Sequence, residues 1–134
     1  MGSKSDIYEI DVLKATTGQV TTILSTTPLA NVYLALFTVA PTDSTAGTEV
    51  TGGSYARIDS KGKWATPAAG SVSTNAVCTF PTATVDWGTV VGFAIMSAIS
   101  GGSMLMWGTL TASKAVNNGD TASFASGALT LTED

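Results

Sequence analysis

The stretch that decides the fold is residues 32–39, VYLALFTV. An unbroken run of apolar and β-branched residues of this length is typical of a strand at the centre of a sheet, because an edge strand is seldom so long and so apolar. Pro41 ends the run, and residues 41–47, PTDSTAG, have the composition of a loop. The first firm element of the chain is therefore a buried strand.

Working outward from this strand, the chain alternates short strands and turns. We expect further strands at 49–51, 54–58, 76–80, 89–96, 103–110, 121–124 and 128–132. Glycine pairs, prolines and the Asn-Asn-Gly-Asp run at 117–120 separate them at intervals of about 8–12 residues. Seven or eight short strands in this spacing predict an all-β fold, a single β-sandwich of the jelly-roll or immunoglobulin-like type.

Residues 1–30 differ from the expected sandwich domain, residues 31–134. Asp6 and Glu9 have the spacing of a helix cap, and a short helix would present one apolar face. The residues of that face are Ile7, Ile10 and Leu13. The β-branched residues at 16–23 instead favour an extended arm. Both readings, short helix and arm, stay open at this point.

Composition excludes several classes of protein. The 134 residues include no His and one Cys. A Ser-His-Asp triad, a Cys-His pair, an imidazole metal site and an intramolecular disulfide are all excluded. The net charge is −4 with six Lys and Arg, which argues against nucleic-acid binding. No apolar run reaches the length that spans a bilayer, and no apolar segment resembles a secretory signal.

The surface expected from this composition is small, polar and weakly charged. Thr, Ser, Ala and Gly number 22, 14, 18 and 14 and make up half of the chain, whereas charged residues are 12 %. Such residues lie against a neighbour without the desolvation cost of buried ions. The composition fits either an ordinary sandwich with polar outer faces or a protein that works inside an assembly.

The groups that could carry chemistry are few. Five carboxylates fall in or beside expected turns, where Asp and Glu cap backbone N–H groups: Asp43, Glu49, Asp59, Asp86 and Asp120. Cys78 lies in an apolar strand pattern and is expected to be a small buried residue. We therefore predict no catalytic residue, no metal site and no cofactor. Of the three tryptophans, Trp87 and Trp107 are expected in the core and Trp64 on the surface.

Residues 31–58, NVYLALFTVAPTDSTAGTEVTGGSYARI, resemble a group of small tailed-bacteriophage structural proteins. The shared pattern is VYxxLFT, a PTD loop, GTEVxGGxYAR, then DWG and GGxxLxWG. These motifs occur in the same order here over residues 31–134. The resemblance implies a β-sandwich virion protein. The lack of a catalytic constellation independently predicts that the chain is no enzyme. Members are often named tail fibre proteins, and some are capsid cement or decoration proteins.

Between these two roles, the sequence favours capsid decoration, because it lacks the repeats or long coiled coil of a fibre shaft. The expected protein lies on the capsid surface of the virion, is assembled in the host cytoplasm, and binds the major capsid protein and sister copies, as a homotrimer. Neither a nucleic acid nor a membrane is an expected partner. The alternative is a tail fibre or tail-tip domain that binds a host surface glycan, with Trp64 as a platform.

Six residues are predicted to contact partners: Ile7, Ile10, Leu13, Tyr55, Arg57 and Trp64. Arg57 is the single arginine, and its planar fork anchors interfaces well. The competing interpretation for Arg57 is an ion pair with Asp59 or Glu49 inside the domain. Removal of residues 1–30 is expected to abolish shell binding and to leave the sandwich folded.

Overall fold

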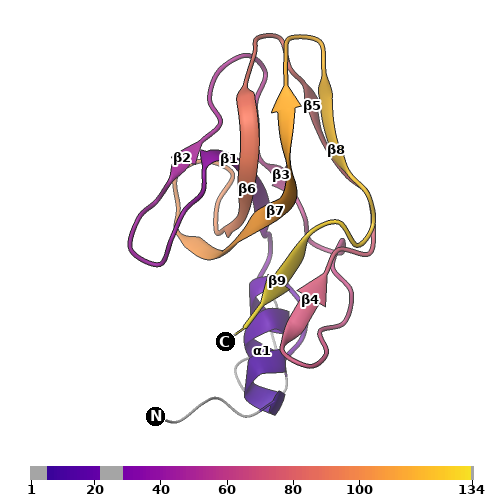
Figure 1. Cartoon of the computed structure of the whole chain (residues 1–134). Coiled ribbons are helices and arrows are strands. Elements are labelled where there is room, and N and C mark those ends of the chain that lie inside the picture. The colour runs from indigo at the N-terminus through magenta and orange to yellow at the C-terminus, as the bar shows by residue number, and fades with distance from the viewer. Residues whose placement is uncertain (1–5, 22–28, 134) are drawn as a thin grey trace.

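The computed structural model describes residues 6–21 and 29–133 and confirms an all-β sandwich with one helix (Figure 1). The elements, in chain order, are α1 (Asp6–Thr16), β1 (Tyr33–Val39), β2 (Thr48–Glu49), β3 (Ile58–Asp59), β4 (Ser71–Ser73), β5 (Cys78–Thr82), β6 (Gly88–Met96), β7 (Met104–Val116), β8 (Thr121–Phe124) and β9 (Thr130–Thr132). Within the described residues, no helix has the length and apolar character needed to cross a membrane.

The strands form one larger sheet and two strand pairs, all antiparallel. The larger sheet has the order β2-β1-β6-β7, and β3 also pairs with β1. The pairs are β4-β9 and β5-β8. β1 lies inside the larger sheet, as the apolar run predicts, and pairs with β2, β3 and β6.

The main core lies under the inner face of the larger sheet. Alternate side chains of a strand point to opposite faces, so Leu34 and Leu36 of β1 enter this core. Phe80, Phe124 and Leu131 of the β5-β8 and β4-β9 pairs join it, and each is at most 6 % exposed. The core therefore holds the larger sheet against both strand pairs.

One glycine shows how tightly β6 and β7 pack. Gly108 of β7 is the cross-strand neighbour of Phe93, which is 1 % exposed. A Cβ atom at Gly108 would lie 2.7 Å from Cζ of Phe93. The ring of Phe93 therefore lies over Gly108, and only glycine leaves room for it.

The N-terminal alternative is resolved in favour of the helix. α1 ends where β-branched residues begin, and the Thr16 and Thr17 hydroxyls donate hydrogen bonds to the carbonyls of Val12 and Leu13 at 2.8 Å. Gly18 follows with φ +75°, the left-handed conformation that closes a helix. These residues thus terminate α1.

Several strand boundaries differ from those expected. Residues 54–57 end a turn and continue as an irregular segment rather than a strand, and Ser54 in the turn has φ +63°. β5 continues past Pro81, and the β5-β8 register shifts between Thr79 and Thr82, where proline offers no N–H. β7 extends to Val116 because it pairs with β6 over two segments separated by a bulge. β4 was not expected.

Candidate interaction site

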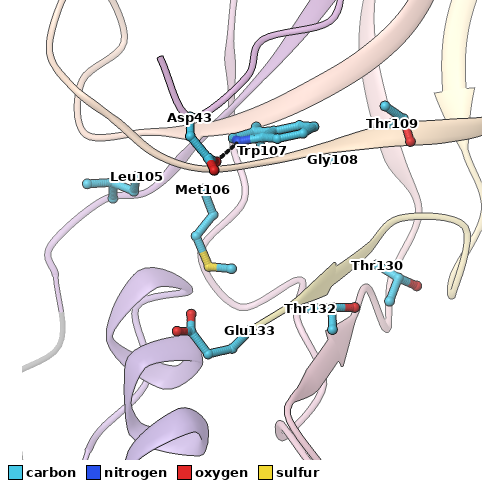
Figure 2. Close-up of a pocket in the computed structure, with 9 residues that line it drawn as sticks. All are labelled: Asp43, Leu105, Met106, Trp107, Gly108, Thr109, Thr130, Thr132 and Glu133. Atoms are coloured by element: carbon cyan, nitrogen blue, oxygen red, sulfur yellow. Dashed lines mark hydrogen bonds between the residues drawn. The ribbon is translucent and has the colours of Figure 1, made fainter. Parts of the chain in front are cut away.

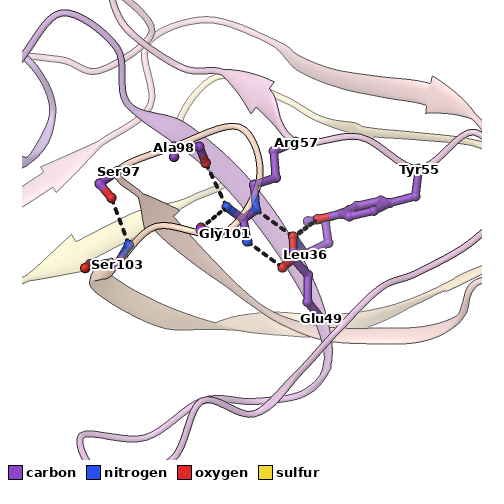
Figure 3. A network of polar contacts seen from close by, with 8 residues as sticks. All are labelled: Leu36, Glu49, Tyr55, Arg57, Ser97, Ala98, Gly101 and Ser103. Carbon is purple, nitrogen blue, oxygen red and sulfur yellow. Dashed lines mark hydrogen bonds and ion pairs between the residues drawn. The ribbon is translucent and has the colours of Figure 1, made fainter.

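The GTEVxGGxYAR stretch forms a polar network centred on Glu49 (Figure 3). Arg57 donates from Nε to Oε1 of Glu49 at 2.8 Å and from Nη2 to Oε2 at 2.7 Å. Tyr55 donates its hydroxyl hydrogen to Oε1 at 2.9 Å and accepts a hydrogen bond from the amide of Leu36 at 3.0 Å. This bidentate pair and its tyrosine connect β2, the loop after it and central strand β1.

The same arginine holds the β6-β7 turn. Nη1 of Arg57 donates to the carbonyls of Ala98 and Gly101, each at 2.7 Å (Figure 3). The amide of Ser103 donates to the Ser97 hydroxyl at 2.8 Å and joins the two ends of the turn. The guanidinium therefore fixes the turn residues that lie between its two acceptors.

The charges of the network are matched and partly shielded from water. The side chains of Arg57 and Glu49 are 8 % and 24 % exposed. Burial alone raises the pKa of Glu49, but hydrogen bonds from Arg57 and Tyr55 and the arginine charge outweigh it, so this pKa lies below its ordinary value. The hydrogen bond to Glu49 raises the pKa of Arg57, and burial raises the pKa of Tyr55. The acid and the base are thus held in their charged forms.

The two glycines of this stretch allow the backbone to turn sharply and to approach Trp87 closely. Gly52 and Gly53 have φ of +84° and +39°, and the carbonyl of Gly53 accepts a hydrogen bond from the indole Nε1 of Trp87 at 3.2 Å. The Trp87 ring packs edge-on against Tyr55, with ring centroids 5.3 Å apart. The turn therefore places Tyr55 between Trp87 and Glu49.

A second connection joins the PTD loop to β7. The indole Nε1 of Trp107 donates to Oδ1 of Asp43 at 3.2 Å (Figure 2). Within the loop, the amide of Thr42 donates to the Thr45 carbonyl at 2.9 Å, and their hydroxyls lie 2.7 Å apart. The loop is therefore ordered by its own threonines and fastened to the larger sheet by Asp43.

An open groove lies between β7 and β9. Its volume is about 470 Å³, and Figure 2 shows Met106 extending across it toward Glu133, while Trp107 leaves β7 on the other side. Among the described residues that line it, the charged side chains are Asp43 and Glu133. The described residues contain no cluster of three or more Asp, Glu, Cys or His that could hold a metal ion. The polar side chains that this groove offers are therefore mainly carboxylates and threonines.

Comparison with known families decides the class of protein. Residues 3–132 match the family model described as podophage GP4 fiber I protein gp80. The chain belongs to this gp80 family. No curated protein matches it. The chain is therefore a structural protein of a tailed-phage virion. Structural proteins of phage fibres are not typically enzymes.

The residues that suggested a phage protein are contacts that hold this gp80-family fold together. Asp43 of the PTD loop meets Trp107 of GGxxLxWG. Glu49, Tyr55 and Arg57 of the GTEVxGGxYAR stretch meet one another. The motif therefore identifies the architecture, whereas spacing along the chain gave no indication that Asp43 and Trp107 pair.

The six predicted contact residues lie in different environments. Leu13 is fully buried in the main core, and Ile10 of α1 is half-buried. The side chain of Ile7 lies outside the described residues. The sequence left Asp59 and Glu49 open as ion-pair partners of Arg57, and the partner in the structure is Glu49. A partner contact for these residues stays a prediction.

The exposed position expected for Trp64 is wrong. Its side chain is 4 % exposed and belongs to the main core. Trp64 forms a bridge with Thr74, and its indole Nε1 donates to the Ser60 hydroxyl at 3.2 Å. The flanking lysines are polar, but the turn they form returns the chain to the core. Trp87 is buried as expected, whereas Trp107 is half-buried.

The remaining polar residues have structural partners. Asp59 accepts from the amide of Lys61 at 3.0 Å, Asp86 from that of Asn118 at 2.8 Å and Asp120 from that of Asn117 at 2.9 Å. These contacts confirm the turn-capping roles expected from sequence. Cys78 is fully buried, as expected, and burial raises the pKa of its thiol.

Proposed function

We propose that the chain is a component of a podophage tail fibre, attached at one end and projecting at the other. The observation that carries this proposal is the family match over residues 3–132, because the family is described as a fibre protein. This preference reverses the order in which the sequence alone ranked capsid decoration and fibre.

The two ends of the molecule are built differently, which supports attachment at one end. At one end α1 packs beside β4 and β9 (Figure 1). A Cβ atom at Gly70 would lie 3.1 Å from Oε2 of Glu9, and the amide of Glu133 donates to the Gly70 carbonyl at 2.8 Å. The two chain-terminal elements are therefore joined at this end, which we name the helix end.

At the opposite end, three loops are locked to one another. The amide of Gly119 donates to the Ala83 carbonyl at 2.7 Å, and the amide of Thr84 donates to that of Gly53 at 3.3 Å. We name residues 52–54, 82–87 and 117–120 the loop end. Rigid loops on a sheet scaffold are a common place for recognition. We therefore assign the helix end to attachment and the loop end to contact with the host surface.

Capsid decoration remains the second candidate, and one observation favours it. Hydroxyl pairs cross the outer faces of β4-β9 and β5-β8. These pairs are Ser73 with Thr130 at 2.8 Å, Thr79 with Ser123 at 3.2 Å, and Thr82 with Thr121 at 2.6 Å. An uncharged polar face of this kind can lie on a coat lattice without desolvating ions.

Immunogold labelling of purified virions distinguishes the two candidates. Antibodies raised against the recombinant chain are expected to label the tail. Label spread over the shell would overturn the fibre proposal and support decoration. If virions that contain the chain by immunoblot carry no label, the chain lies in the interior of the particle. That result would contradict both the fibre and the decoration proposals.

A further inference from the structure

We propose that the second half of β7 binds an extended segment of a different virion protein by strand addition, and that a carboxylate of this segment pairs with Lys114. The place is a groove of about 500 Å³ between residues 110–114 of β7 and residues 123–128. We name residues 110–114 the β7 edge. The inference does not depend on the fibre or the decoration proposal, because a virion structural protein has neighbouring chains at either location.

The position of β7 in the larger sheet leaves one of its sides without a partner strand. The sheet has the order β2-β1-β6-β7, so β7 is an outermost strand, and its 13 residues make it the longest strand described. β9 lies beside its first half, since a Cβ atom at Gly108 would lie 3.4 Å from the carbonyl oxygen of Thr130. A long edge strand offers main-chain groups on which another chain can pair. The open part of this edge is the second half.

The β7 edge is also released from β6. β6 pairs with β7 up to Thr109 and again from Lys114, and the four residues between them have no partner in β6. Outside β6, no described residue bonds the backbone of residues 110–113, and residues 111–113 are exposed. An added strand supplies N–H and C=O groups at the spacing that such a segment requires. The occupant that fits these groups is therefore an extended polypeptide.

The groove beside the β7 edge has room for a main chain. Its larger apolar residues are Leu110, which is half-buried, and Phe124, which is 6 % exposed. On the opposite wall, a Cβ atom at Gly127 would meet no heavy atom within 4 Å. Five residues of β7 border the groove over about 16 Å, the length of a short added strand. The space therefore accepts a strand of about five residues beside the β7 edge.

Lys114 defines the charge of the segment. It is the one charged side chain among the described residues that line the groove. Its ammonium donates to the carbonyl of Ser123 at 3.0 Å and lies 5.1 Å from the ring centre of Phe124. An ammonium has three donors, so hydrogens remain for an acceptor that enters the groove. A carboxylate also matches the charge, and the segment is therefore expected to carry Asp or Glu beside Lys114.

The same charge argues against a second copy of this chain as the occupant. β7 contains no Asp or Glu, so two paired β7 edges would bring Lys114 of each copy into the interface without a carboxylate. In the described strands, the acidic residues are Glu49 and Asp59. Glu49 pairs with Arg57, and Asp59 accepts from the amide of Lys61. A segment of a different protein supplies the carboxylate that these strands do not offer.

Hydrogen exchange tests whether the β7 edge gains a partner in the particle. In the recombinant full chain, the amides of residues 111–113 should exchange fast, because they are exposed and unpaired with β6. In purified virions the same amides should exchange at least about tenfold more slowly, since bonds to an added strand protect them. Equal exchange in the two samples would overturn the proposal. Protection in the free chain that grows with concentration would identify a second copy as the occupant and overturn it as well.

Proline variants distinguish strand addition from simple coverage of the surface. Thr111→Pro and Ala112→Pro each remove one amide hydrogen where β7 has no partner in β6. Successive amides of a strand point to opposite sides, so one variant removes an amide that faces the groove. That variant should reduce incorporation into virions about tenfold by immunoblot, because an interface hydrogen bond is lost. Thr111→Ala and Ala112→Ser keep both amides and should be incorporated as the wild type is. Circular dichroism should show all four folded, and normal incorporation of both proline variants would overturn the proposal.

A pair of charge reversals tests the carboxylate. Lys114→Glu should reduce incorporation about tenfold, because it places two carboxylates side by side in the groove. Lys61→Glu makes the same change of charge at an exposed residue outside the groove and should be incorporated normally. Equal incorporation of these two variants would overturn the assignment of an acidic segment to this groove.

Discussion

Arg57 binds more partners than any other side chain described above. It bonds Glu49 in bidentate fashion and reaches two carbonyls of the β6-β7 turn. The sequence singled out this residue, but for an interface. Only the folded chain brings Glu49, eight residues away, and the turn, more than forty residues away, to the same guanidinium. That Arg57 is the single arginine of the chain indicated that the residue matters, but the sequence did not indicate which groups it binds.

Arg57→Lys should lower the free energy of unfolding by about 2 kcal/mol, the usual magnitude for lost hydrogen bonds to a charged group. Lysine keeps the charge but cannot bond Glu49 and the turn together. Urea unfolding measures the loss. Lys61→Ala, at an exposed position, is the control and should change stability little. Equal values for Arg57→Lys and the wild type would contradict the central place of the network.

Glu49 gives the stability a dependence on pH. Its pKa in the folded protein lies below the ordinary value of 4.5, so the contribution is present above pH 4.5 and is lost as the pH falls through the folded pKa. The urea midpoint of unfolding of the wild type should therefore decrease as the pH is lowered from about 5 to about 3. Glu49→Gln should be less stable at pH 7 and show a shallower decline on acidification. A parallel decline in both proteins would assign the effect to other carboxylates.

At the scale of elements, long apolar strands were predictable and contacts between distant segments were not. Residues 32–39 and 89–96 are almost entirely apolar because both faces of β1 and β6 are largely covered, and that signal is local. The turn at Ser54 depends on the distant Thr82 carbonyl, and the return of Trp64 to the core depends on the packing of the main core. The helix was foreseen as one of two alternatives, and its packing through Leu13 decided between them.

The burial of Leu13 changes what a truncation can test. Because α1 contributes to the main core, removal of residues 1–30 would remove core side chains together with any arm, and the sandwich is not expected to remain intact. Leu13→Ala should cost about 2–5 kcal/mol, as a large-to-small change at a fully buried site does. Val20→Ala, at a 59 % exposed position, should cost little. Similar thermal midpoints for these two variants would show that α1 is dispensable for folding.

At the scale of the whole molecule, weak charge and abundant hydroxyls have a structural use. The hydroxyl pairs across β4-β9 and β5-β8 satisfy polar groups without ions. The larger sheet, by contrast, buries apolar side chains on both faces, with a second small cluster on the face away from the main core. The molecule therefore has a hydroxyl-lined side and two ends of different construction, a distribution suited to a virion structural protein of the gp80 family.

The orientation of the chain in the particle is the most direct test of the fibre account. A cryo-EM map of the whole virion, sharp enough to place the sandwich, should show it at the tail, with α1 toward the particle and the loop at residues 117–120 toward solvent. Density for the sandwich repeated over the capsid shell, or at the tail with α1 outermost, would contradict the account.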